Sequence, residues 1–295
     1  MLSGWIILDK PHGLGSTQAV GAVKRLLREG GYPKPKIGHG GTLDPLATGV
    51  LPIALGEATK LAGRMLDSDK AYDFTIRFGA ETDTLDLEGT VVATSEVVPV
   101  RAGIETVLPR FTGLVEQVPP AFSALKIDGK RAYDLARAGE DVVLGKRRIT
   151  IHSLSLWEGG ADNEATFSAS VSKGTYIRSL ARDIAHALGT VGHVTMLRRV
   201  KAGAFTENQA ISLDILEEKA RSRALEDILL PLRTALVDIP ALALSPEQAR
   251  LIGHGRVLSG VAAMDGLHLA TLDDVPVALV DVSSGTVTVE RGFNL

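Results

Sequence analysis

Apolar and polar residues alternate along several segments of the chain, and this pattern predicts β-strands with one buried face. In one segment the alternate positions hold Tyr72, Phe74, Ile76 and Phe78. Two other alternating segments flank a Gly-Gly-Ala-Asp-Asn turn and predict a hairpin. Strands are predicted over residues 4–8, 51–55, 72–78, 115–118, 123–127, 149–157, 165–171 and 193–200.

Helices are predicted where apolar residues recur every three or four positions. One begins at Ser16 or Thr17, either of which can cap it, and stops at Gly30. A second runs from Tyr176 to Leu188, and shorter ones are expected over residues 57–66, 103–111 and 132–138. Because strands and helices mix without a strict β-α-β rhythm, the sequence predicts an α+β fold with a mostly antiparallel sheet.

The pattern changes after about residue 240, where short predicted strands follow one another closely. Ser245 is expected to cap a helix over residues 246–251, and strands are predicted over residues 267–272, 275–280 and 286–290. We therefore expect a large domain over residues 1–239 and a small β-rich domain over residues 240–295.

The composition excludes several kinds of site. None of the 295 residues is Cys, so disulfides, thiolate nucleophiles and Cys-ligated metal centres are excluded. The seven His residues are scattered and no His-Glu-x-x-His motif occurs, so we expect no metal ion. No run of 18 apolar residues exists, and no basic segment precedes the N-terminal apolar run. Neither a transmembrane helix nor a signal peptide is therefore predicted.

The net charge of −3 hides an uneven distribution. Residues 207–295 carry 7 Lys+Arg and 13 Asp+Glu, whereas residues 1–206 carry 25 and 22. Residues 173–201 hold six basic residues and one acidic residue. Phosphate binding needs a local positive potential rather than a positive net charge. The first part of the chain is therefore compatible with a nucleic-acid partner, although a solvated basic face would give the same pattern.

Residues 38–52, GHGGTLDPLATGVLP, have the most unusual local composition, with four Gly and two Pro. The carboxylate in this segment, Asp44, precedes Pro45, which restricts it to extended geometry. An Asp-Pro pair often begins a surface turn, but here the flanking residues are apolar. A carboxylate held between apolar side chains needs a cationic partner. No P-loop or G-x-G-x-x-G pattern occurs in the segment, so no nucleotide cofactor is indicated.

The longer segment GHGGTLDPLATGVLPIALGEATK resembles the catalytic motif of the bacterial tRNA pseudouridine-55 synthase (TruB) family. Further motifs of this family are resembled, in order, by WIILDKPHGLGST, LDSDKAYDFTIRFGAETDTLDLEG, PPAFSALKIDGKRAYDLARAG, SKGTYIRSLARDIAHALG and GHVTMLRRV. Together they cover most of residues 3–205. The resemblance implies a pseudouridine-synthase fold, with a mixed, mostly antiparallel sheet, flanking helices and a PUA-like C-terminal domain.

The resemblance also implies a reaction. A uridine in the T-loop of tRNA, at position 55, flips out, its bond between N1 and C1′ breaks, and a bond between C5 and C1′ forms. No cofactor or metal is implied. The family's aspartate corresponds to Asp44 and attacks C1′, attacks C6 of the base, or assists elimination to a glycal. The sequence leaves all three routes open.

Position by position, the resemblance assigns further roles. Tyr72 matches the tyrosine that stacks on the target base and Arg178 the arginine that pairs with the aspartate. Tyr176 and Leu197 match residues that line the uracil pocket, and His39 matches the motif histidine, which contacts a displaced nucleotide. From the pattern alone, Tyr72 and Leu197 are equally well explained as inward-facing strand residues.

The resemblance places Lys10 in a turn beneath the motif loop, where it is expected to support the site. The expected partner is the T-arm of tRNA, bound by a cytoplasmic monomer without contact to a membrane. Two alternatives stay open: a guide-RNA-dependent synthase of the same superfamily, and a non-catalytic tRNA-folding protein. Possible RNA contacts are Lys126, Lys130, Arg131, Arg147, Arg148, Arg198 and Arg199.

Overall fold

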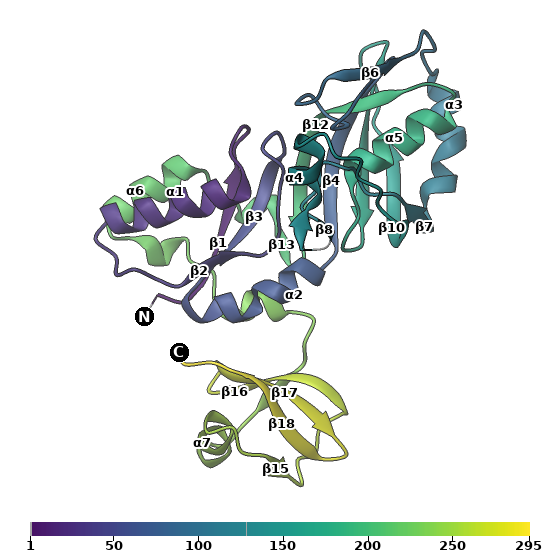
Figure 1. The fold of residues 1–295 in the computed structure, drawn as a ribbon. Coiled ribbons are helices and arrows are strands. Elements are labelled where there is room, and N and C mark those ends of the chain that lie inside the picture. Colours follow the sequence, from purple (N-terminus) through teal and green to yellow (C-terminus); the bar gives the residue numbers. More distant parts are fainter. Residues whose placement is uncertain (1, 128) are drawn as a thin grey trace.

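A computed structural model describes residues 2–127 and 129–295 of the chain (Figure 1). Its main feature is a central mixed sheet with strand order β1-β3-β12-β4-β11-β10-β7, to which β2 adds on β3 and β13 on β12. The pairs are antiparallel except for β12 with β3. The strands are β1 (Gly4–Lys10), β2 (Ile37–His39), β3 (Thr48–Leu55), β4 (Lys70–Phe78), β7 (Gly113–Gln117), β10 (Arg147–Leu156), β11 (Glu164–Val171), β12 (Gly192–Ala202) and β13 (Phe205–Thr206).

Helices cover the two halves of this sheet separately. In Figure 1, α1 and α6 lie together beside β1 and β3, whereas α5 and α3 lie beside β4, β10 and β7. The helices are α1 (Ser16–Glu29), α2 (Ala62–Asp67), α3 (Arg101–Val107), α4 (Ala132–Arg137), α5 (Ile177–Ala187), α6 (Leu213–Arg221) and α7 (Pro246–Gly253). Short 3₁₀ turns occupy Gly56–Leu61, Leu108–Phe111, Glu207–Gln209, Leu225–Asp227 and Leu232–Leu236.

Two small antiparallel ribbons and a C-terminal sheet complete the fold. The ribbons are β5 (Ala80–Thr82) with β6 (Val91–Thr94), and β8 (Lys126–Ile127) with β9 (Lys130–Arg131). The C-terminal sheet contains β14 (Ala241–Ala243), β15 (Leu258–Ser259), β16 (Gly266–Leu272), β17 (Val275–Ser283) and β18 (Thr286–Gly292). We call residues 240–295 the C-terminal module, which lies below the central sheet and its helices in Figure 1.

The predicted α+β fold with a mostly antiparallel sheet is confirmed. The predicted hairpin is β10 with β11, and the alternating strand is β4. Its inward face carries Phe74, whose ring stacks on Phe167 with 5.2 Å between centroids. In the C-terminal module the predicted Ser245 cap is present, since the Ser245 hydroxyl accepts from the Gln248 N–H.

Other local predictions were wrong. Gly15, not Ser16 or Thr17, is the N-cap of α1. The Ser16 hydroxyl turns inward instead, donating to the Leu43 carbonyl and accepting from the Leu43 N–H. The strand predicted over residues 123–127 is reduced to Lys126–Ile127, and α6 was not predicted. The inward turn of Ser16 and the packing of α6 on α1 depend on partners far along the chain, which local spacing does not reveal.

The two halves of the central sheet meet at a short parallel contact between β3 and β12. Thr48 pairs with Arg198 and Gly49 with Arg199. Gly49 has φ +97°, and a Cβ built there would lie 2.3 Å from the Arg199 carbonyl oxygen. A residue without a side chain is therefore required where the halves join.

This close approach predicts that Gly49→Ala destabilises the protein. The positive φ alone costs about 1–3 kcal/mol for an L-residue, and displacement of β12 adds to that cost. The measurement is urea unfolding, with Gly38→Ala as control, because no atom lies within 4 Å of a Cβ at Gly38. Equal stabilities of the two variants would contradict the prediction.

Candidate active site

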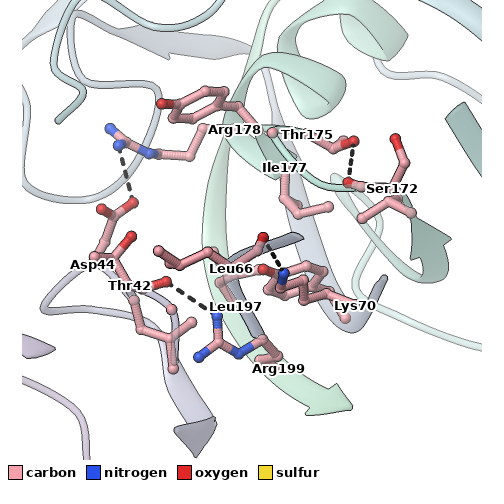
Figure 2. Close-up of a pocket in the computed structure, with 16 residues that line it drawn as sticks. Thr42, Asp44, Leu66, Lys70, Ser172, Thr175, Ile177, Arg178, Leu197 and Arg199 are labelled. Carbon is pink, nitrogen blue, oxygen red and sulfur yellow. Dashed lines mark hydrogen bonds and ion pairs between the residues drawn. The ribbon is translucent and has the colours of Figure 1, made fainter. Parts of the chain in front are cut away.

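A cavity of about 240 Å³ opens where the two halves of the central sheet meet (Figure 2). Its walls come from the loop before β3, the end of α2, and the strands and turns around β4, β11, α5 and β12. Four charged residues, Asp44, Lys70, Arg178 and Arg199, share the lining with seven apolar or aromatic ones: Leu43, Leu66, Tyr72, Val171, Tyr176, Ile177 and Leu197. The cavity thus combines apolar walls with a few converging charges, which is typical of ligand sites.

Asp44 and Arg178 form an ion pair at the edge of this cavity. Arg178 Nη2 lies 2.9 Å from Asp44 Oδ2. The arginine side chain is 7% exposed, whereas the aspartate side chain is 45% exposed. One partner is therefore fixed within the protein, and the other presents its carboxylate to whatever enters the cavity. This is the cationic partner that the sequence predicted for Asp44.

Arg178 is held by more than Asp44. Its Nη1 donates to the Thr84 carbonyl at 2.7 Å, and its Nη2 donates to the Phe122 carbonyl at 2.9 Å. Asp86, a buried carboxylate that the sequence analysis did not single out, lies 3.4 Å from Nη1. Asp86 is held in turn by the Thr84 hydroxyl and the Glu88 N–H. These contacts fix the plane of the guanidinium and hence the direction from which it meets Asp44.

The remaining residues assigned to the uracil pocket converge on the same cavity. Tyr72 comes from β4, Leu197 from β12, and Tyr176 from the turn before α5. Burial raises the pKa of the Tyr176 phenol above its usual value, so the ring stays neutral. The Gln117 side chain holds the Tyr176 backbone with two hydrogen bonds. Its Nε2 donates to the Tyr176 carbonyl at 3.1 Å, and its Oε1 accepts from the Tyr176 N–H at 2.8 Å.

Lys10 lies beneath the loop that carries Asp44. Its side chain is fully buried, and its ammonium donates to the carbonyls of Pro11, Leu14 and Pro45. Burial lowers the pKa of Lys10 to about 8. The structure therefore places Lys10 as a support for the backbone next to Asp44.

His39 is not among the residues that line the cavity. It lies half-buried on β2, and burial lowers the pKa of its imidazole below the usual value, which favours the neutral ring. Its Nδ1 is buried and has no hydrogen-bond partner among the described residues.

The seven basic candidates separate into two groups. Arg198 is bound to Asp9 and Glu207, and Arg199 is 1% exposed inside the cavity wall. The prediction of a surface contact was therefore wrong for Arg199, because β12 turns its side chain under the Asp44 loop. The other candidates are exposed on the β8–β9 ribbon and at the start of β10: Lys126, Lys130, Arg131, Arg147 and Arg148.

Within residues 2–127 and 129–295, no group of three or more His, Asp or Glu side chains is placed to hold a metal ion. No helix in the same residues is long and apolar enough to cross a membrane.

The lowered pKa of Lys10 predicts a pH dependence of stability. The folded chain releases this proton near pH 8, whereas the unfolded chain keeps it until about 10.5. Between these values the unfolded state binds more protons, so the free energy of unfolding rises with pH, by at most about 1.4 kcal/mol per pH unit. In Lys10→Met this contribution is absent. Urea unfolding between pH 7.5 and 9.5 should show a steeper rise for the wild type, and parallel curves would contradict the prediction.

Comparison with known proteins covers the whole chain. Residues 24–177 match the TruB family pseudouridylate synthase N-terminal domain, and residues 178–237 match the tRNA pseudouridylate synthase B C-terminal domain. The protein named tRNA pseudouridine synthase B of Novosphingobium aromaticivorans is 64% identical, over 100% of this chain and 98% of its own. That of Zymomonas mobilis is 59% identical, over 99% of this chain and 96% of its own.

Solved structures agree with these matches. A crystal structure of a Cbf5-Nop10-Gar1 complex contains a chain that is 26% identical, with a TM-score of 0.75. The match covers 99% of this chain and 85% of that chain. An H/ACA RNP bound to a substrate RNA containing 2'-deoxyuridine contains a chain of 25% identity with a TM-score of 0.74 and the same coverage. The matched domains and the identity along the full length show that this chain belongs to the TruB family of pseudouridylate synthases.

Proposed function

We propose that this protein is a tRNA pseudouridine synthase that isomerises the uridine at position 55, in the T-loop. The names of its relatives support the activity and the tRNA substrate. The observation that carries the proposal is the Asp44–Arg178 ion pair at the edge of a cavity lined by Tyr72, Tyr176 and Leu197. This arrangement gives an accessible carboxylate next to surfaces on which a base can stack.

The chemistry balances without a co-reactant. The bond between N1 and C1′ breaks, the base turns, C5 bonds to C1′, and the proton on C5 is lost as N1 gains one. Asp44 acts on C1′, on C6 or in an elimination to a glycal, and each route uses its ionised carboxylate. Arg178 orients that carboxylate through a planar, hydrogen-bonded guanidinium.

The target base must leave the T-loop stack to reach the cavity. Unstacking costs a few kcal/mol, and stacking on an aromatic ring returns about 1–3 kcal/mol. Tyr72 is positioned in the cavity wall for that stacking, and its hydroxyl is a candidate for assisting removal of the C5 proton. We assign His39 to the displaced nucleotides outside the cavity, since it lies beside the loop and not in the lining.

The exposed basic residues of the β8–β9 ribbon and β10 are proposed to bind T-arm phosphates. The ribbon begins at Lys126, four residues after Phe122, whose carbonyl accepts from Arg178. A short backbone segment therefore connects the basic residues of the ribbon to the Asp44–Arg178 ion pair. We include Arg198 only as a peripheral contact, because Asp9 and Glu207 already neutralise it.

We also propose a division at residues 239 and 240 into a catalytic domain and a small PUA-like domain. In support, the C-terminal module has its own core, which includes Ile252, Val280 and Val287. We further propose that the protein acts as a cytoplasmic monomer. A guide-RNA-dependent role is disfavoured because the relatives at 59% and 64% identity are named as tRNA enzymes.

The test of function uses purified protein alone, tRNA transcript labelled with tritium at C5 of uridine, and release of tritium as the readout. Asp44→Asn is expected to bind tRNA with near-normal affinity and release no tritium, because it keeps shape but lacks the charge and the nucleophile. Asp67→Asn is the control, since Asp67 is an exposed carboxylate that pairs with Lys173 and does not line the cavity. Turnover by Asp44→Asn would refute the assignment. An inactive wild type that turns over only with added guide RNA would favour the alternative.

The proposed phosphate contacts predict a change in salt dependence. Replacing both Arg147 and Arg148 by Gln should lower tRNA affinity and flatten the plot of log affinity against log salt by up to about two contacts. The matched control replaces Arg250 and Arg256, which are exposed in the C-terminal module, and should leave the slope unchanged. Equal slopes for the wild type and the Arg147/Arg148 variant would remove that pair from the interface.

A further inference from the structure

Arg199 is a buried cation for which the proposed chemistry provides no role. It is 1% exposed, and among the described residues only Trp5 is a larger fully buried side chain. Figure 2 shows it on the opposite side of the Asp44 loop from Arg178, with Asp44 and Thr42 between the two guanidinium groups.

Its hydrogen bonds go to the Asp44 loop and to β3, the strand that follows the loop. Nη1 donates to the Thr42 carbonyl at 3.1 Å, and Nε donates to the Val50 carbonyl at 2.7 Å. Thr42 precedes Asp44 by two residues, and Val50 follows it by six. A single rigid guanidinium therefore links the backbone just before Asp44 to the strand that follows it, β3.

The backbone around Arg199 leaves room for this arrangement. Gly41 has φ +144°, and a Cβ there would sit 3.4 Å from Nη1 and 3.6 Å from Nη2. On the other side, Gly49 lets β3 approach the Arg199 backbone. A glycine thus stands at each place where the loop passes close to the arginine.

Stability alone gives a poor account of this residue. Within the described part of the chain, no carboxylate lies within ion-pair distance of Arg199, and its Nη2 has no hydrogen-bond partner. Another buried cation, Lys70, lines the same cavity. A buried charge without a counter-charge costs several kcal/mol. The presence of Arg199 at this position is better explained by the backbone segments that it holds in place.

We propose that Arg199 is a positioning residue for Asp44, fixing the loop from beneath while Arg178 orients the carboxylate from the cavity side. Arg199 acts through the loop backbone and need not touch the reacting atoms. The inference rests on the proposed synthase activity for its kinetic consequence, but its structural consequence, a fixed Asp44 loop, is independent of that activity.

The kinetic test compares Arg199→Lys and Arg199→Met with the wild type at saturating tRNA. Misplacement of a reacting group by about 1 Å can cost roughly 100-fold in rate. We expect a loss of that order in Arg199→Met, with tRNA affinity within about twofold of wild type. Arg199→Lys should keep only part of the rate, because an ammonium lacks the fork that spans both carbonyls. Arg77→Met is the control, because Arg77 is an exposed arginine of neighbouring β4, paired with half-buried Glu164, and is expected to keep full rate.

The structural test is hydrogen exchange of the amides of residues 42–50, with thermal melting of each variant as a measure of the whole fold. Faster exchange confined to this loop in both Arg199 variants, and absent in Arg77→Met, supports the proposal. It is overturned if loop exchange is unchanged, if kcat stays within threefold of wild type, or if the lost rate only follows the fraction unfolded. An inactive wild type would refute the proposed function, while loop exchange would still decide the role of Arg199.

Discussion

The site depends on one ion pair whose partners come from different halves of the sheet. Asp44 stands on the loop before β3, and Arg178 stands in the first turn of α5, which packs against β4 and β12. Their 2.9 Å contact therefore holds only while the two halves keep their relative position. The halves are joined in the sheet by the short β3–β12 pairing at Gly49. Packing at this junction is thus a constraint on the chemistry as well as on the fold.

Three buried cations in or beneath the cavity wall donate hydrogen bonds to carbonyl oxygens. Lys10 donates to three carbonyls, Lys70 to those of Met65, Leu66 and Ser68, and Arg199 to two. A carbonyl stabilises a cation without adding a full negative charge. Among the described residues that line this cavity, Asp44 is the one carboxylate, and Arg178 binds it. Buried cations thus hold the backbone around Asp44, and no other carboxylate among the described residues lines the cavity.

The sequence was informative wherever a pattern is local. Alternation predicted β4 and the β10–β11 hairpin, and the helical spacing of apolar residues predicted α5 to within one residue at each end. Asp44 was singled out by its apolar neighbours, but its meeting with Arg178 rested on the resemblance to a family. Asp86 was missed because an acidic turn gives no sign of burial. Arg199 was misplaced because arginines are usually exposed, and only the close approach of β3 to β12 shows where its side chain goes.

The C-terminal module contributes to the site through packing. None of its residues lines the cavity. Leu269 and Phe293 instead share a buried cluster with Trp5 of β1, and the Asn294 N–H donates to the Glu57 carboxylate. β1 ends at Lys10, which holds the backbone beside Asp44. The module thus packs on the start of β1, whereas the end of β1 carries Lys10, which supports the Asp44 loop. A change in the module would act on Asp44 through this shared packing, so it should lower stability before it alters the chemistry.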